Sequence, residues 1–220
     1  ENESDITSKE EYVKGELTFI GKDYQNPNFS KSIKIRGRGN FTWQQPKKPF
    51  QIKFNKKVSL LDMPEDKKWI FLANFVDKSM SRTAIAFQMG YLSNLDWTAK
   101  SEFSEVFLNN KYIGTYQISE KVEEDNHRVN IGENGYLLEV DQIDKIDDED
   151  VYFKTPRNIL FNIKSPDIIL NSDEYNYIKN YISDVENILY AQNFDGDKLK
   201  KFIDTDSFVE FYLINEISKN

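Results

Sequence analysis

Two arginines set among glycines, Arg36 and Arg38, are the residues whose type and spacing point most clearly to chemistry. In 35-IRGRGN-40 the glycines let the backbone turn tightly and approach a ligand, because glycine adopts conformations that other residues avoid. If the strand continues through both arginines, their side chains point to the same side. Guanidinium groups together with exposed backbone amides are suited to binding phosphate. A simple turn with solvated arginines is the alternative, since a G-x-G spacing alone is weakly diagnostic.

Three further polar residues stand where a ligand could be held: Lys53, Gln88 and Glu120. Lys53 lies within the apolar segment 50-FQIKF-54, as either a solvated lysine or an ammonium group that reaches a phosphate. Gln88 is predicted to lie towards the buried side of a helix, where an amide needs hydrogen-bond partners. Glu120 ends an expected strand, and its alternative is an ordinary exposed carboxylate.

The composition excludes several kinds of site. The 220 residues include no cysteine and one histidine, which rules out disulfides, thiolate chemistry and zinc sites built on several thiolates or imidazoles. That histidine, His127, lies in a polar loop and is expected to be exposed. The acidic run 144-DKIDDED-150 lacks the ligand spacing of a calcium loop. A net charge of −8 argues against non-specific nucleic-acid binding, and no apolar run is long enough for a membrane span.

The elements that position these residues follow from the hydrophobic pattern. Apolar alternation and turn signals predict strands at 12–21, 32–43 and 50–54, which we expect to pair as an antiparallel meander. A short apolar segment at 70–75 precedes a helix predicted at 79–95, with Ser79 as its N-cap. Spacings of three and four residues predict the buried stripe of this helix, made of Met80, Ala84, Phe87, Tyr91 and Leu95.

The second half of the chain changes from strands to helices. Strands are predicted at 103–109 and 112–119, joined by an Asn-rich hairpin turn, and then at 135–141, 151–154 and 159–164. Helices are predicted from Asp173 to about 193 and from about Asp206, with Val209, Leu213 and Ile217 on one line. This order predicts an α+β protein. We expect a polar lead-in at 1–11, a sheet lobe at 12–122 and a partial helical lobe at 123–220.

Several blocks, taken in order from about Tyr12 to Asn220, resemble the CotH family of spore coat protein H-type atypical kinases and their secreted relatives. The matching blocks are 36-RGRGNFTW-43, 46-PKKPFQIKF-54, 60-LLDMPEDKKWIFLANFVDKSMSRTAIAFQMG-90, 107-FLNNKYIGTYQISEKV-122 and 136-YLLEVD-141. The family is similar to protein kinases in fold and transfers phosphate from ATP, with Mg²⁺, to serines of coat proteins. The resemblance therefore implies these cofactors for the complete domain, with weak or absent binding by this chain alone. It also implies a protein substrate or a coat or extracellular assembly partner, and a location in the spore coat or outside the cell.

The resemblance also implies roles for individual residues. The segment from Arg36 and Arg38 to Gly39 would cover the phosphates, and Lys53 would be the phosphate-binding lysine of the third strand. The helix at 79–95 would correspond to the αC helix of kinases. Gln88 stands where many relatives have a carboxylate, so it could hydrogen-bond Lys53 without forming an ion pair.

The resemblance places Glu120 just before the hinge that binds adenine. The family's base-like and metal-binding aspartates are expected after Asn220, so this chain by itself is expected to transfer no phosphate. Two other functions stay open. One is a non-catalytic assembly or binding module on the same fold. The other is a carbohydrate-binding β module, which is weakened because most aromatic residues fall at core spacing.

Overall fold

The computed structural model describes residues 5–21 and 28–218, which form the predicted α+β protein. The chain divides into two compact units: unit 1, Glu1–Val122 with Ile214–Asn220, and unit 2, Glu123–Leu213. Residues 1–4 of the predicted lead-in, part of the predicted loop after the first strand, and Asn220 lie outside the described residues. No described helix has the length and apolar character needed to cross a membrane.

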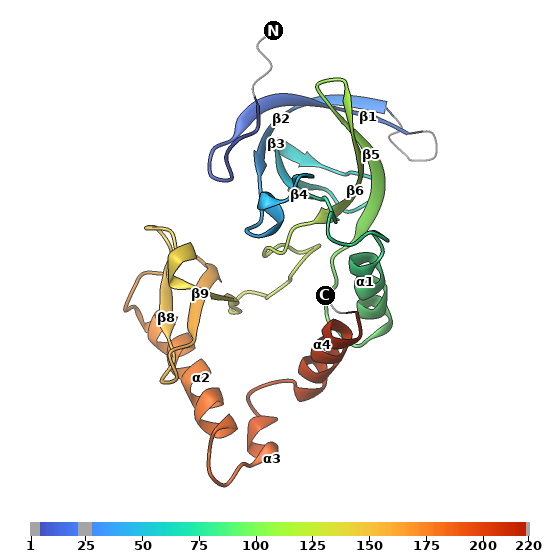
Figure 1. The fold of residues 1–220 in the computed structure, drawn as a ribbon. Helices are drawn as coiled ribbons and strands as arrows, with labels where there is room; N and C mark the ends of the chain where they lie inside the picture. Colours follow the sequence, from blue (N-terminus) through green and yellow to red (C-terminus); the bar gives the residue numbers. More distant parts are fainter. Residues whose placement is uncertain (1–4, 22–27, 219–220) are drawn as a thin grey trace. The chain divides into compact units, whose positions relative to one another are not determined.

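Unit 1 is built on a curled antiparallel sheet of six strands in the order β1-β2-β3-β4-β6-β5 (Figure 1). The predicted meander of the first three strands is confirmed. The second strand ends at Gly37, before the predicted boundary, because the glycine-rich segment turns away from the sheet. The strands are β1 (Val13–Ile20), β2 (Asn28–Gly37), β3 (Phe50–Val58), β4 (Asp66–Leu72), β5 (Ser101–Leu108) and β6 (Lys111–Glu120).

The core of unit 1 lies on one face of this sheet. Ile35 pairs with Ile52, and Ile52 pairs with Trp69. Direct cross-strand partners point to the same face, and Ile52 and Trp69 are completely buried there. Arg36 and Lys53 alternate with these residues along β2 and β3, so their side chains point to the opposite face.

The turn between β5 and β6 confirms the predicted hairpin. Asn109 and Asn110 have φ angles of 49° and 59°. Asparagine tolerates this left-handed region, and two such residues make the tight turn that matches the twist of paired strands. The pairing of β5 with β6 runs from Leu108 opposite Lys111 to Ser101 opposite Ser119.

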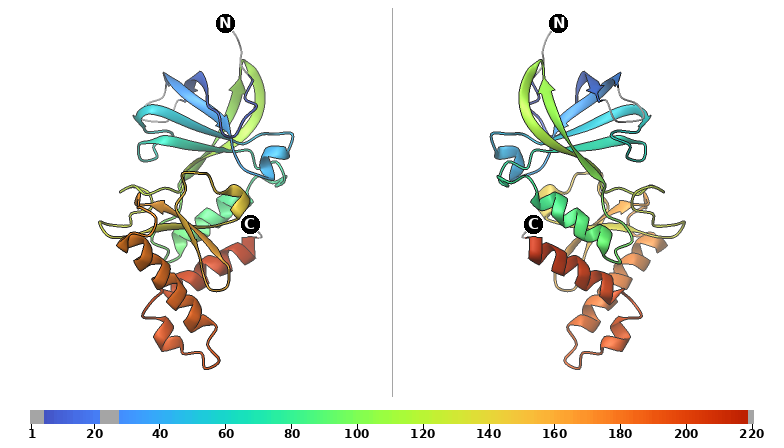
Figure 2. Two further views of the ribbon diagram at one scale, coloured as in Figure 1. Left: turned by 90° about the vertical axis from the view of Figure 1, so that its left-hand side faces the viewer. Right: turned by 90° about the vertical axis from the view of Figure 1, so that its right-hand side faces the viewer.

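The helix predicted at 79–95 is shorter and begins differently. Helix α1 (Arg82–Leu92) lies beside the end of the sheet at which β6 ends (Figures 1 and 2). Ser79 is not its N-cap. The N-cap is Ser81, whose side chain forms no capping hydrogen bond. The Asp77 carboxylate instead accepts hydrogen bonds from the backbone N–H of Arg82 at 2.8 Å and of Ser79 at 3.1 Å.

The predicted buried stripe of α1 is wrong. The buried residues are Ala86 and Gly90, and Tyr91 is 45% exposed. Gly90 packs so closely that a Cβ there would collide with the hydroxyl of Thr98. Small residues allow this contact, and a search for large apolar residues cannot detect them. Gln88 is exposed, contrary to its predicted place towards the buried side.

Unit 2 contains a three-stranded antiparallel sheet in the order β7-β9-β8, followed by helices. Its core is formed by Phe153 and Ile163 of the sheet with Tyr175 and Ile178 of the first helix. The predicted hairpin of β8 and β9 and both long helices are confirmed. The elements are β7 (Leu137–Asp141), β8 (Tyr152–Lys154), β9 (Leu160–Ser165), α2 (Asp173–Leu189), α3 (Gly196–Leu199) and α4 (Thr205–Ser218), whose residues from Ile214 onward belong to unit 1.

Two features of the second half of the chain were not evident in the sequence. The short helix α3 was not predicted, and it begins where the Asp195 carboxylate accepts a hydrogen bond from the backbone N–H of Lys198. In α4 the predicted line of Val209, Leu213 and Ile217 exists, but these side chains are 53%, 48% and 67% exposed. The line is therefore an apolar surface among the described residues.

A buried carboxylate joins α2 to the β8–β9 turn. Glu186 is 5% exposed and accepts hydrogen bonds from the hydroxyl of Thr155 at 2.6 Å and from the backbone N–H of Arg157 at 3.0 Å. The same hydroxyl accepts a hydrogen bond from the backbone N–H of Ile159. Both carboxylate oxygens are thus used to fix the turn, as a buried charge requires.

Candidate anion-binding site

A pocket of roughly 440 Å³ lies in unit 1, between the segment that follows β2 and the segment that follows β4. It is lined by three cationic side chains, Arg38, Lys47 and Arg82, and by one carboxylate, Asp77. The excess of positive charge stands out in a protein whose net charge is −8. The other lining residues are Gly39, Thr42, Gln45, Pro49, Leu72, Ala73, Asn74, Phe75, Val76 and Thr83.

Arg38 brings a desolvated charge to this pocket. Burial lowers the pKa of its guanidinium, and the positive charge of Arg36 lowers that pKa further. Arg38 forms no ion pair with any described residue. A partly buried cation without a carboxylate partner is costly for the fold, so a bound anion would supply the missing charge.

The side chain of Arg36 has different contacts from that of Arg38. Because β2 ends at Gly37, the strand alternation that would align the two arginines stops between them. The guanidinium of Arg36 lies 4.7 Å from the ring centre of Tyr12 and donates a hydrogen bond to the carbonyl of Glu10. Of the two predicted arginines, Arg38 is the one that lines the pocket.

The glycines of this segment permit close packing around the pocket. Gly39 has φ +82°, and a Cβ there would collide with the hydroxyl of Thr42. A Cβ on Gly37 would collide with the ring of Trp43. Glycine is therefore required at both positions by space, and at Gly39 also by backbone conformation.

Lys47 was missed by the sequence analysis. Its ammonium group donates hydrogen bonds to the carbonyls of Ala73, at 2.9 Å, and Thr115, and it lies 4.4 Å from the ring centre of Tyr116. Burial lowers the pKa of this group. The neighbouring Lys48 instead donates to the carbonyl of Trp43 at 2.7 Å. The segment 46-PKKP-49 contains two lysines, but its sequence does not show which one lines the pocket.

The carboxylate of the pocket is already engaged. The Asp77 oxygens accept hydrogen bonds from the hydroxyl of Ser79 at 2.6 Å, from the backbone N–H of Ser79, and from the backbone N–H of Arg82 at the start of α1. These bonds, the one from the Ser79 hydroxyl above all, lower the pKa of Asp77. The Nε of Arg82 lies 4.0 Å from the same carboxylate. Among the described residues no group of three or more His, Cys, Asp or Glu side chains is placed to hold a metal ion.

Lys53 and Gln88 are not brought together. Lys53 pairs with Lys34 on one side and Lys68 on the other, on the sheet face opposite the core. Gln88 is exposed on α1. Within the part of the chain that the structure describes, no hydrogen bond joins these two side chains, so the predicted contact is not formed. Lys53 is also absent from the lining of the pocket.

Glu120 is buried rather than exposed at the surface, with 4% of it accessible. Its carboxylate accepts a hydrogen bond from the backbone N–H of Lys100 at 2.8 Å, and its own N–H donates to the carbonyl of Lys100. The residue therefore fixes the chain where it enters β5. Burial, with the nearby charges of Glu120 and Glu102, raises the pKa of Tyr91 to about 12.

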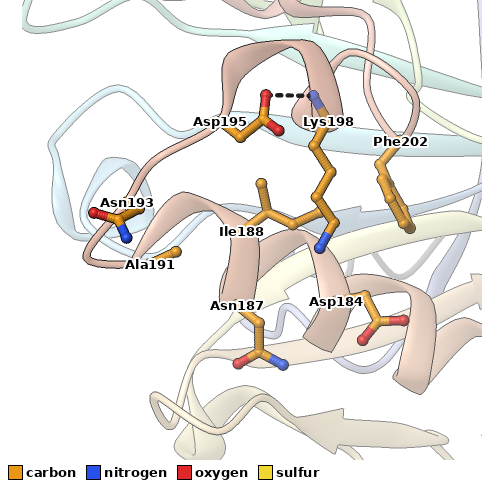
Figure 3. A pocket seen from close by; sticks show the side chains of 8 residues that line it. All are labelled: Asp184, Asn187, Ile188, Ala191, Asn193, Asp195, Lys198 and Phe202. Carbon is orange, nitrogen blue, oxygen red and sulfur yellow. Dashed lines mark hydrogen bonds between the residues drawn. The ribbon is translucent and has the colours of Figure 1, made fainter.

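A second pocket, of roughly 280 Å³, lies in unit 2 between α2 and α3 (Figure 3). Its polar groups include Asp184, Asn187 and Lys198, whose side chains are all exposed. No charged group is buried there, so this pocket lacks the desolvated charge that distinguishes the pocket in unit 1.

Comparison with protein families shows the family to which the chain belongs. Residues 35–220 match the family model described as CotH kinase protein. The match covers most of the chain, so the chain belongs to the CotH kinase family, as its motifs suggested. No curated protein matches the sequence. Membership supports a kinase-like function and a kinase-like requirement for nucleotide in general.

Proposed function

We propose that this CotH-family chain is the nucleotide-binding part of a kinase that transfers phosphate from ATP to protein serine, and that the pocket of Arg38, Lys47 and Arg82 receives the nucleotide phosphates. The proposal depends on one observation: desolvated cations line a pocket whose single carboxylate is hydrogen-bonded to the start of α1. Catalysis in kinases consists mostly of positioning phosphates and stabilising their charge. Family membership supports the kinase-like class.

Each cation contributes differently to phosphate binding. Arg38 offers a planar fork of N–H donors, which matches two phosphate oxygens at once. Lys47 is held in place by two carbonyls, so little conformational freedom is lost when it also meets an anion. Gly39 has no side chain to keep phosphate from the backbone. A triphosphate would offset the desolvation of Arg38 and Lys47 and would also meet the exposed charge of Arg82.

The pocket also offers a surface for a base. Phe75 and Val76 line it and are 45% and 59% exposed. Exposed apolar side chains beside a charged pocket are typical of a site in which a ligand has both an apolar and an ionic part. We propose that the adenine ring packs on Phe75 while the phosphates meet the cations. The pocket volume lies within the usual range for small-molecule sites, about 300 to 1,000 Å³.

The described residues do not provide a magnesium site in this pocket. Mg²⁺ binds through one or two carboxylates together with substrate phosphates. Of the residues that the structure describes, Asp77 alone brings a carboxylate to the pocket lining, and its oxygens accept hydrogen bonds from Ser79 and α1.

This lack of an available carboxylate favours a second candidate function. A non-catalytic assembly module on the same fold would use its surface to bind a coat or extracellular partner. Such a module needs neither a base nor a metal ligand in the pocket. For either function we propose a location on the spore surface or outside the cell, which follows from the family alone.

Calorimetric titration of ATP into the chain, with and without Mg²⁺, separates the two functions. We expect submillimolar binding that Arg38→Gln weakens at least tenfold, because a charge-assisted hydrogen bond contributes about 1.5–3 kcal/mol. No binding at millimolar ATP would refute the nucleotide site and leave the assembly module. Equal affinity of the wild type and Arg38→Gln would show that ATP binds elsewhere.

A further inference from the structure

Four lysines stand in one row across the first four strands of unit 1. Lys14 of β1 is the direct partner of Lys34 of β2, Lys34 of Lys53 of β3, and Lys53 of Lys68 of β4. Direct partners in antiparallel strands point to the same face. With strands about 4.8 Å apart, the row is about 14 Å long. It lies on the face opposite the apolar core.

The row is unfavourable for the isolated fold. Like charges directly opposite each other destabilise a sheet, and here three such pairs follow one another. Lys14, Lys34 and Lys53 form no ion pair with any described residue. Glu16, two residues from Lys14 on the same face of β1, accepts a hydrogen bond from the hydroxyl of Ser30. An unfavourable charge pattern of this kind indicates a ligand of opposite charge.

The charge of the chain is divided unevenly between its units. Unit 2 has 9 Lys and Arg against 21 Asp and Glu, whereas unit 1 has 20 against 16. Unit 1 is therefore basic, although the net charge of the whole chain is −8. The lysine row adds a local concentration of that charge, on exposed side chains at Lys14 and Lys34.

We propose that this lysine row, Lys14, Lys34, Lys53 and Lys68, binds an extended acidic segment of a partner protein that lies across the strands. In an extended peptide, side chains on one side recur about every 6.6 Å. Three acidic residues in an Asp-x-Asp-x-Asp pattern therefore span about 13 Å, which matches the row. The surface does not include any residue that lines the nucleotide pocket.

The test uses a fluorescent ten-residue peptide of alternating Asp and Ser, and a control peptide with Asn in place of Asp. We expect the acidic peptide alone to bind, and its anisotropy signal to fall as salt rises towards physiological strength, where charges are screened beyond about 8 Å. Lys34→Thr should weaken binding about fivefold or more, because Lys34 stands between two other lysines of the row. Lys111→Thr, at an exposed lysine of β6 outside the row, should leave binding unchanged.

The melting temperature gives a second test, because a lysine with a purely structural role would lower it when replaced. Lys34→Thr removes two repulsive pairs and introduces a residue that favours strands, so its melting temperature should rise by a few degrees. Loss of peptide affinity together with a higher melting temperature supports the proposal. Unchanged affinity, or a lower melting temperature, would overturn it.

Two competition experiments identify the occupant. Arg38→Gln should bind the acidic peptide normally, which separates this surface from the nucleotide pocket even if ATP binding fails. If ATP displaces the peptide from the wild type, the row belongs to the nucleotide site, and the proposal is wrong. If single-stranded DNA of equal charge binds more tightly through Lys34, the occupant is a nucleic acid, and the proposal is likewise wrong.

Discussion

Replacement of Lys47 by Met separates a role in anion binding from a role in folding. The substitution keeps an unbranched apolar stem beside Tyr116 and removes only the ammonium group. That group donates to the carbonyls of Ala73 and Thr115. Lys48→Met is a matched control, because Lys48 is the next residue and contacts Trp43 outside the pocket.

The expected magnitude follows from these contacts. Two hydrogen bonds from a charged donor would each contribute about 1.5–3 kcal/mol. Burial nevertheless lowers the pKa of Lys47, so the folded chain holds the ammonium less favourably than water does. The two effects oppose each other, and we expect a net loss of stability below about 2 kcal/mol. ATP affinity should fall roughly 10- to 100-fold, since one charge-assisted contact with phosphate is lost.

The pH dependence has a defined sign. Because the folded chain holds Lys47 with a lowered pKa, the ammonium loses its proton below the ordinary value of about 10.4. ATP binding should weaken as pH rises through that lowered pKa. In the window between the folded and unfolded pKa values the unfolded chain binds more protons, so stability should rise with pH there. Lys47→Met should remove both effects.

Calorimetry with ATP and thermal unfolding give the required readouts. Lys47→Met should melt within a few degrees of the wild type and bind ATP weakly, and Lys48→Met should bind ATP normally. Normal ATP affinity in Lys47→Met would refute the assignment of Lys47 to phosphate. A large loss of stability together with lost binding would instead make Lys47 a structural residue.

Three other predictions concern single positions. Gly39→Ala should lose about 1–3 kcal/mol of stability in urea titrations, because of its φ of +82° and the collision at the pocket; Gly132→Ala, with φ +66° and open space, should lose less. Glu186→Ala should destabilise unit 2 by about 3–5 kcal/mol and speed amide exchange in the β8–β9 turn, because the buried Thr155 hydroxyl and the part-buried N–H of Arg157 lose their acceptor. Asn180→Ala, at an exposed site on α2, should have little effect. Burial raises the pKa of Tyr116 to about 12, so the folded chain binds more protons than the unfolded one above pH ~10, and stability should fall as pH rises from ~10 to ~12; stability that is constant across this range would refute the shift.

Local patterns predicted much of the fold. The alternation of Ile33 and Ile35 with charged residues identified β2, and the pair Asn109 and Asn110 identified the hairpin. Such signals need only a few neighbouring residues. The start of α1 was misplaced because Ser79 suits a cap by residue type, whereas the structure has the N-cap at Ser81 and pairs the Arg82 N–H with the Asp77 carboxylate.

The candidate site was predicted only in part, because its parts come from distant segments. Arg38 was identified from its glycines, whereas Lys47 depends on carbonyls 26 and 68 residues further along the chain. Glu120 is buried because β4 places Trp69 opposite it. Strand alternation predicts on which face of the sheet Lys53 lies, but it does not predict which residues of other strands lie beside Lys53. The lysine row depends on three separate strand registers, which no local pattern fixes.

One measurement distinguishes ATP binding in the nucleotide pocket from ATP binding on the sheet face of Lys53. It is the map of backbone amide chemical shifts during titration of the isotope-labelled chain with ATP. If the phosphates bind in the pocket, saturable shifts will concentrate in residues 38–49 and 72–83, with the Gly39 amide among them. Arg38→Gln should remove these shifts. Shifts centred on Lys34, Lys53 and Lys68, with the Gly39 amide unchanged, would place the nucleotide at the lysine row, on the sheet face opposite the apolar core. That result would contradict the proposed site.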